Sequence, residues 1–365
     1  MVNASSTIYN FSAGPAMLPL PVLERARREM TSLDGIGMSV MEISHRSSDF
    51  ERVLVAAERG LRDLLGIGDQ YRVLFFQGGA TLQFSIIPMN FLAGGGSADY
   101  VVTGAWGEKA VAEGSKIGVI QTIYTSKESG YRIVPGPDEL SFNPDAAYVH
   151  YTSNETIDGV EFEYDLDAGG IPVICDASSN ILSKPIDLEK YALIYAGAQK
   201  NIGPSGVTVV IIREDMIGRV PAGLPTLLDY RRVAAERSMA NTPNTWGIYL
   251  IGLVCDWLQE QGGVSGIAEM NRAKADLLYK AIDSSDGFYA GHAEHAARSR
   301  MNVTFRLRTA ELDENFCADA EAAGFSGLRG HRSVGGIRAS IYNAFPIEGV
   351  EHFVGFMQDF AASNG

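Results

Sequence analysis

Continuous apolar runs alternate with helix-like segments over the first two thirds of the chain. The runs are rich in β-branched and aromatic residues and fall at 71–76, 99–104, 146–152, 171–176, 191–197 and 207–212. Because the apolar residues are consecutive, the runs are typical of strands that are covered on both faces of a sheet. Helical patterns lie between them, at 80–92 and 107–118. This order predicts a doubly wound, mainly parallel α/β domain.

The pattern changes near residue 244, where helices and isolated strands replace the regular alternation. Helices are predicted at 245–261, 268–282, 311–324 and 348–360, and strands at 301–307 and 335–341. We therefore expect a large domain over residues 18–243 and a smaller α+β domain formed by residues 1–17 and 244–365. Prolines at the start of segment 19–30 favour a short helix, which we expect to pack on the small domain.

The length and composition fit a soluble protein of two domains. The chain has 365 residues, of which 46% are hydrophobic and 20% are charged. Such a length suits about two domains, and no apolar stretch approaches the ~18 residues that cross a bilayer. The N-terminus lacks the basic start and apolar core of a signal peptide, so a cytosolic protein is expected.

The net charge of −14 bears on the choice of partner. Long-range repulsion makes nucleic acid and anionic membranes poor partners. An anionic small molecule would consequently need a local basic pocket.

Cysteine and histidine usage gives no sign of a metal centre. Cys175, Cys255 and Cys317 are odd in number and far apart, which argues against a disulfide framework and a thiolate metal site. His292 and His295 lie in a polar segment that offers no third ligand. We therefore expect no metal.

Asp176 and Lys200 each follow an apolar run that is predicted to be a strand. Ligands of doubly wound sheets bind beyond the carboxyl ends of the strands. Desolvation there lowers the pKa of a lysine toward the neutral amine that attacks an aldehyde. An amine and an acid in these places suggest pyridoxal 5′-phosphate (PLP) chemistry. A surface lysine and a helix-capping aspartate are the alternatives.

The remaining lysines differ from Lys200 in their surroundings. They lie in polar or helix-surface contexts that are typical of solvated charge, and they are Lys109, Lys116, Lys127, Lys184, Lys190, Lys274 and Lys280.

Three other predicted strand ends carry side chains that suit a phosphorylated ring. The turn QGGATLQF could present the backbone N–H groups of Gly79, Ala80 and Thr81 to a phosphate, although such turns are common structural connections. Trp106 could stack on a planar ring or simply pack in the core. Thr156 could bond a ring substituent or only stabilise a turn.

Polar and basic side chains gather in three further segments. Asn241 and Thr242 could bind phosphate oxygens or form no more than a turn with Pro243. Arginine suits bidentate contact with carboxylate or phosphate, and surface ion pairs are the alternative role. The basic candidates for an anion site are His45, Arg46, His331, Arg332 and Arg338.

Taken together, the motifs resemble one enzyme family along nearly the whole chain. They are FSAGPAMLP, SHRSSDF, QGGATLQF, GAWGEK, SNETIDG, CDASSN, GAQKNIGPSGV, MANTPNTW and GHRSVGGIRASIYNA. They closely resemble the phosphoserine aminotransferases, which are class V aminotransferases of PLP fold type I. The His-Arg pair and the C-terminal GHR block distinguish this family from other class V enzymes. The resemblance implies a homodimer with active sites at the subunit interface.

The resemblance also implies roles for the cofactor-binding residues. Lys200 would form the Schiff base and move the proton, Asp176 would hold the pyridinium, and Trp106 would stack on the ring. Thr156 would bond the phenolic oxygen. The phosphate would be bound by Ala80, Thr81 and Gln199, with Asn241 and Thr242 of the partner subunit. One departure is the Ala80-Thr81 pair, where the family often has serine or arginine.

For the substrate, the resemblance makes Arg338 the anchor of the α-carboxylate. His331 and Arg332, with His45 and Arg46 of the partner subunit, would hold the distal phosphate or γ-carboxylate. One basic pocket would then serve both substrates, because each carries a carboxylate at one end and an anion at the other.

The implied reaction is reversible ping-pong transamination in serine biosynthesis. L-glutamate and 3-phosphohydroxypyruvate would give 2-oxoglutarate and O-phospho-L-serine, and aminotransfer to the 4-phosphohydroxythreonine skeleton of vitamin B6 synthesis would be a second activity. Three alternatives are another class V aminotransferase such as a serine-pyruvate or alanine-glyoxylate type, a cysteine desulfurase, and a binding module without turnover. The desulfurase would need a cysteine on a mobile loop, whereas Cys317 lies in a helical pattern and Cys175 in a strand.

Overall fold

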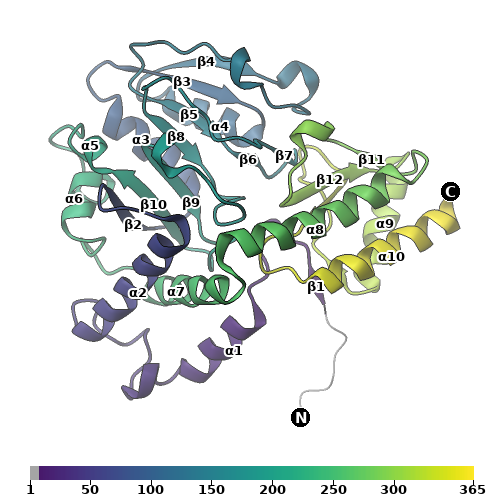
Figure 1. The fold of residues 1–365 in the computed structure, drawn as a ribbon, viewed down its shortest axis with the longest axis horizontal. Helices are drawn as coiled ribbons and strands as arrows, with labels where there is room; N and C mark the ends of the chain where they lie inside the picture. The colour runs from purple at the N-terminus through teal and green to yellow at the C-terminus, as the bar shows by residue number, and fades with distance from the viewer. Residues whose placement is uncertain (1–7) are drawn as a thin grey trace.

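The computed structural model describes residues 8–365, which build a large sheet covered by helices on both faces (Figure 1). The sheet has seven strands in the order β2-β10-β9-β8-β5-β3-β4. β10 runs antiparallel to both of its neighbours, and the other pairs are parallel. The doubly wound, mainly parallel prediction is therefore confirmed. The strands are β2 (Tyr71–Gln77), β3 (Ser97–Val102), β4 (Val119–Thr125), β5 (Val149–Thr152), β8 (Val173–Asp176), β9 (Leu193–Gly197) and β10 (Val207–Arg213).

Alternate side chains of one strand enter two different hydrophobic clusters, as continuous apolar runs require. Val73 and Phe75 of β2 pack with α2 (Ser48–Leu65), α7 (Thr245–Glu260) and the start of α8 (Gly263–Asp283). Leu74 and Phe76 pack on the other face. The helices of that face are α3 (Gln83–Phe91), α4 (Ala105–Gly114), α5 (Glu214–Ile217) and α6 (Tyr230–Ala235).

The edge strand β4 was not predicted from the sequence. It pairs with β3 alone, and most of its side chains are wholly or partly exposed. A strand with so little buried surface needs no continuous apolar run.

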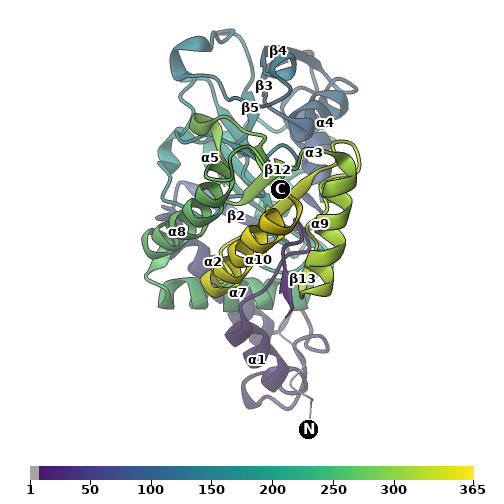
Figure 2. The ribbon, with the colours of Figure 1, turned by 90° about the vertical axis from the view of Figure 1, so that its right-hand side faces the viewer.

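The C-terminal part forms the smaller α+β layer, with helices α8, α9 and α10 on the face that Figure 2 turns to the viewer. Its antiparallel sheet has the order β11-β12-β14. Phe316 and Phe353 lie at the centre of its aromatic core. The elements are β11 (Ala290–Gly291), β12 (Asn302–Arg306), β14 (Ile337–Ser340), α9 (Ala310–Ala322) and α10 (Ile347–Asn364), with β1 (Tyr9–Asn10) paired to β13 (Phe325–Ser326).

Helix α1 (Leu20–Glu29) forms where expected, but its predicted position on the small domain is wrong. Its buried residues Val22 and Ala26 belong to the large-domain cluster, and Arg25 forms an ion pair with Asp256 of α7 at 3.0 Å. The apolar face of α1 packs against α7, and α7 in turn packs against α2 (Figure 1).

The packing of α7 bears on the expected boundary at residues 243/244. Ile251 and Val254 of this helix are fully buried in the same cluster as the large sheet. Helix α8 then passes from that cluster into the small-domain core, through Leu278 and Ile282. We propose that the large domain extends through α7. Residues 1–7 of the expected small-domain segment 1–17 lie outside the described residues.

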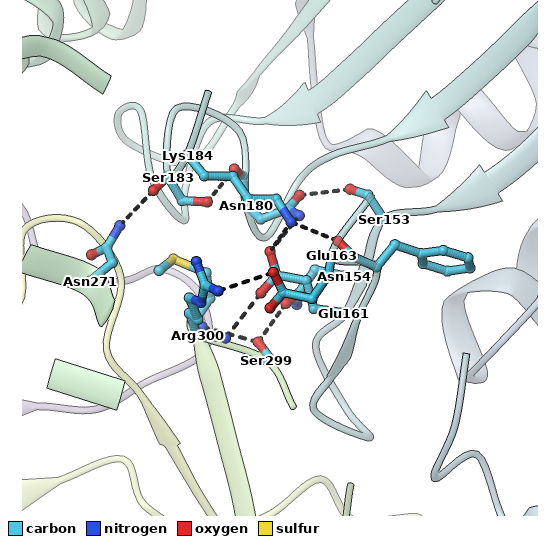
Figure 3. A network of polar contacts seen from close by, with 12 residues as sticks. Ser153, Asn154, Glu161, Glu163, Asn180, Ser183, Lys184, Asn271, Ser299 and Arg300 are labelled. Carbon is cyan, nitrogen blue, oxygen red and sulfur yellow. Dashed lines mark hydrogen bonds and ion pairs between the residues drawn. The ribbon is translucent and has the colours of Figure 1, made fainter. Parts of the chain in front are cut away.

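A buried polar network joins the two parts of the molecule (Figure 3). Glu161, which is 1% exposed, accepts hydrogen bonds from Asn180 Nδ2 at 3.1 Å and from the backbone N–H of Arg300 at 3.0 Å. Lys184 Nζ lies 3.3 Å from Glu161 Oε1, so the prediction of a solvated Lys184 is wrong. Asn180 also accepts a hydrogen bond from Ser153, beside the end of β8. The network therefore fixes the small domain against the strand ends.

Lys274 also departs from the prediction that it is solvated. It is 1% exposed on α8, and its Nζ donates to three backbone carbonyls at 2.7–3.1 Å. The acceptors belong to Ile341, Tyr342 and Phe345. Three acceptors match the three donors of an ammonium, so the carbonyl oxygens take the place of a carboxylate partner and the lysine holds this turn. The helical pattern around Lys274 gives no sign of this role.

Within residues 8–365, no helix has both the length and the apolar character needed to cross a membrane. The predicted cytosolic location is not tested by this finding.

Candidate active site

Four parallel strands bring the expected cofactor residues to one edge of the sheet. Trp106 follows β3, Thr156 follows β5, Asp176 ends β8, and Lys200 follows β9. The Nζ atom of Lys200 donates to Thr156 Oγ1 at 2.7 Å and lies 5.6 Å from the centroid of the Trp106 ring. The structure thus places these side chains together at the carboxyl edge of the sheet, where they were predicted to lie.

The surroundings of Lys200 lower its affinity for a proton. Burial lowers its pKa to about 8, and the positive charge of Arg338 acts in the same direction. The negative charges of Asp176 and Glu155 oppose that shift. A lysine with this pKa supplies a substantial neutral fraction near pH 8, as an amine nucleophile requires.

The N-terminal segment closes over the stem of this lysine. Gly14 has φ +147°, and a Cβ there would lie 3.3 Å from Gln199 Cγ and 3.5 Å from Lys200 Cγ. The backbone N–H of Ala16 donates to the carbonyl of Gln199 at 2.8 Å. The glycine lets the FSAGPAM segment pass close to the site.

Asp176 is buried, and its Oδ1 accepts the backbone N–H of Ser178 at 2.9 Å. Burial raises the pKa of Asp176, while the charge of Lys200 lowers it. The carboxylate stabilises the turn after β8, and no helix begins there for it to cap.

Trp106 and Arg338 each carry an unpaired donor close to Lys200 and Thr156. Within residues 8–365, Trp106 Nε1 and Arg338 Nε are buried without a hydrogen-bond partner. Arg338 Nη1 donates to the carbonyl of Thr156 at 3.5 Å. Burial lowers the pKa of Arg338, and the negative charge of Asp158 opposes this shift. Buried donors of this kind are stabilised when an anion arrives.

The phosphate candidates lie beside the same edge. Ala80 and Thr81 form a short 3₁₀ turn after β2, and Gln199 adjoins Lys200. Thr242 accepts a hydrogen bond from Gln77 through its carbonyl, so the segment of Asn241 lies near the end of β2.

The remaining basic candidates lie on two other segments. His331 and Arg332 occupy the turn before β14, where His331 Nδ1 lies 2.6 Å from Ser333 Oγ. His45 and Arg46 precede α2. Within the described part of a single chain, Lys200 Nζ forms its hydrogen bonds with Thr156 and Ser179, and none with His45, Arg46, Asn241 or Thr242.

Three side chains of the site were missed by the sequence reasoning. Ser179 Oγ accepts a hydrogen bond from Lys200 Nζ at 2.9 Å, and Glu155 and Asp158 face the start of α4. Hydroxyl residues directly after Asp176 were a usable signal for Ser179. Glu155 and Asp158 lie in a segment whose residues are all buried. Their burial would have marked them as site residues, but the sequence does not show it.

The side chains present fit PLP. A lysine of lowered pKa, a buried acid and an indole lie at one edge of the sheet, and the unpaired Arg338 Nε offers a contact for a carboxylate. Among residues 8–365, no group of three or more histidine, cysteine, aspartate and glutamate side chains is placed to hold a metal ion.

The chain is similar to known proteins in both sequence and structure. Residues 8–353 match the protein family described as aminotransferase class-V. The phosphoserine aminotransferase of Laribacter hongkongensis is 54% identical over 98% of this chain and 100% of its own length. The structure of a phosphoserine aminotransferase from Bacillus circulans subsp. alkalophilus has a TM-score of 0.97 at 50% identity, covering 99% of this chain and 100% of the other.

A PLP-bound phosphoserine aminotransferase from Trichomonas vaginalis is also similar in structure. Its TM-score is 0.91 at 40% identity, and the match covers 96% of this chain and 99% of the other.

Proposed function

Because the chain belongs to the phosphoserine aminotransferase family of class V, we propose that the pocket around Lys200 carries out transamination between L-glutamate and 3-phosphohydroxypyruvate. The activity is PLP-dependent phosphoserine aminotransfer, which gives 2-oxoglutarate and O-phospho-L-serine. The observation that carries the assignment of the site is the Lys200 amine, which two hydroxyl groups hold beside a buried acid and an indole.

PLP, when bound, supplies an aldehyde that condenses with amines and a ring that accepts electrons while its nitrogen is protonated. Lys200 would hold the cofactor, take a proton from the substrate Cα as a general base and deliver it to the cofactor C4′ as a general acid. The hydroxyls of Thr156 and Ser179 orient its Nζ atom for this transfer.

We propose that side chains at the same edge of the sheet make the other cofactor contacts. Asp176 would keep the ring nitrogen protonated, Trp106 would stack on the ring, and Thr156 would bond the phenolic oxygen. The turn of Ala80 and Thr81 donates to the phosphate, together with Gln199 and with Asn241 and Thr242 of the partner subunit.

Arg338 anchors the substrate α-carboxylate in this proposal. The distal anion is held by His331 and Arg332, with His45 and Arg46 of the partner subunit. Aminotransfer to the 4-phosphohydroxythreonine skeleton stays a second proposed activity, because that molecule carries the same two kinds of anion.

Replacing Arg338 by alanine is expected to weaken both half-reactions. A hydrogen bond to a charged group contributes about 1.5–3 kcal/mol, so KM for L-glutamate and for 3-phosphohydroxypyruvate should each rise roughly 10- to 100-fold. Steady-state kinetics with each substrate varied in turn measures this. Arg329→Ala is the matched control, because Arg329 lies nine positions earlier in the same C-terminal segment. An Arg338→Ala enzyme with both KM values unchanged would refute the assignment.

Exposed apolar side chains support a homodimer. Leu20, Leu23, Met30, Met38 and Met41 are all exposed on α1 and the segment that follows it, and α1 projects from the body in both views (Figures 1 and 2). An apolar surface of this kind is typical of a protein interface. The expected partner is a second copy, whose His45 segment continues directly from this surface.

Met41→Asp is therefore expected to produce monomers and to lower activity. Met41 is 56% exposed, and a charge there would be buried unpaired in the interface. Analytical ultracentrifugation measures the mass. Val119→Asp is the control, since Val119 is 58% exposed but lies on the edge strand β4. A Met41→Asp protein that stays dimeric and active would refute this interface.

A further inference from the structure

One short segment after β5 contacts several parts of the active site. In residues 154–159, Thr156 binds Lys200 through its hydroxyl and Arg338 through its carbonyl. The segment is itself fixed to the small domain, because Thr304 Oγ1 donates to the carbonyl of Asp158 at 2.9 Å and the N–H of Ser299 donates to that of Gly159 at 3.0 Å.

Two acids of this segment hold the beginning of α4, the helix that carries Trp106. Glu155 Oε2 accepts the backbone N–H of Trp106 at 3.0 Å, and its Oε1 accepts that of Gly107 at 2.8 Å. Asp158 Oδ2 accepts the N–H of Ala105 at 3.2 Å. These are donors that the first turn of a helix leaves without partners. The two acids therefore fix the direction of the helix at its start, and with it the position of Trp106.

The side chain of Glu155 packs directly against the backbone of position 104. It is 0% exposed, and a Cβ at Gly104 would lie 2.5 Å from its Cγ and Cδ atoms. Only glycine at position 104 lets the backbone approach the carboxylate this closely.

The charge of Glu155 also reaches Lys200. Both of its oxygens accept N–H donors at a helix start, which favours the ionised form. Burial nevertheless raises the pKa of Glu155 to about 8, and the charges of Asp158 and Asp176 add to that shift. In return, the negative charge of Glu155 raises the pKa of Lys200.

We propose that Glu155 is a positioning residue for transamination, which holds Trp106 and the start of α4 in place against Lys200. The inference rests on the roles proposed above for Lys200 and Trp106. Glu155 acts through these two residues, by the hydrogen bonds of its two oxygens and by its charge.

Glu155→Gln tests the inference in the holoenzyme. The amide has the same size but turns one acceptor into a donor that faces a backbone N–H, so Trp106 should shift. The cofactor should dissociate roughly tenfold faster or more, and kcat should fall more than KM rises. The ionised form of Glu155, which predominates above its pKa of about 8, raises the pKa of Lys200. Because the amide cannot ionise, the pH midpoint of the cofactor's visible absorption band should fall by on the order of half a unit to one unit.

Two further variants separate positioning from a general loss of stability. Glu113→Gln removes a partly exposed acid from the same helix, where it pairs with Lys116, and should leave all three measurements unchanged. Glu155→Asp keeps the charge but shortens the reach. Its pH midpoint should stay close to that of the wild type while cofactor dissociation is still accelerated.

A Glu155→Gln enzyme with wild-type cofactor dissociation and an unshifted pH midpoint would overturn the inference. A lowered melting temperature with both readouts unchanged would do the same. Should Glu155→Gln fail to fold, a Glu155→Asp enzyme with wild-type cofactor dissociation would be equally decisive. A different result would refute the proposed function, namely a Lys200→Ala enzyme that still holds the cofactor covalently.

Discussion

Lys200→Ala is expected to lose transamination almost completely, with kcat reduced by at least roughly 10²–10⁴-fold. This is the range that a positioned general acid and base contributes, and the lysine is in addition the covalent anchor of the cofactor. Its Nζ atom is held by Thr156 and Ser179, and its pKa is lowered to about 8 by burial. The measurement is steady-state turnover of L-glutamate with 3-phosphohydroxypyruvate.

Borohydride reduction gives an independent readout for the same variant. In the wild type, peptide mass spectrometry after reduction should find the cofactor mass on Lys200 and on no other lysine. The neutral amine becomes more abundant as pH rises toward and through about 8, so cofactor attachment to the cofactor-free chain should accelerate over that interval. Lys116→Ala, which removes an exposed lysine, is the control and should behave as the wild type. A Lys200→Ala enzyme that retains reducible cofactor and turnover would contradict the assignment.

Asp176→Asn is expected to lower kcat by about 10²–10³-fold, the scale of losing one preorganised electrostatic contact in an active site. The amide preserves size but carries no charge to keep the ring nitrogen protonated. The carboxylate is buried at the end of β8, so solvent does not replace it. Substrate KM should change far less than kcat, because Arg338 is untouched.

An exposed acid supplies the comparison for Asp176. Asp138→Asn alters a solvent-facing turn and should leave kcat unchanged. Single-turnover absorbance changes with L-glutamate alone would locate the loss in the chemical step. If Asp176→Asn turns over as fast as the wild type, the acid is only a stabiliser of the turn after β8.

The strand ends of the large sheet could be predicted because both faces of the sheet are covered. Consecutive apolar residues mark such strands, and Asp176 and Lys200 are found directly after two of them. Edge strand β4 was missed for the converse reason, since its exposed positions carry no apolar run.

Contacts between distant segments could not be predicted from local patterns. The helical period of α1 indicates an apolar face but not the partner, which is α7. Lys274 has an ordinary helical context in the sequence and is buried only because three carbonyls of the 341–345 turn surround its amine. The capping role of Glu155 likewise depends on α4 meeting the segment after β5.

The resemblance to phosphoserine aminotransferases supplied what the pattern could not, which is the reaction. From the residues alone, Trp106 and Thr156 each had a structural alternative. Their meeting with Lys200 at one edge now supports the functional role of both. The roles of His45, Arg46, Asn241 and Thr242 depend on a second subunit and stay predictions.

The most direct test of the central claim is the initial rate of 2-oxoglutarate release from L-glutamate, measured with 3-phosphohydroxypyruvate and with glyoxylate as the alternative amino acceptors. We expect rapid release with 3-phosphohydroxypyruvate, a kcat/KM far below it with glyoxylate, and no release from the Lys200→Ala enzyme. Preference for glyoxylate, or no release with 3-phosphohydroxypyruvate, would contradict the account.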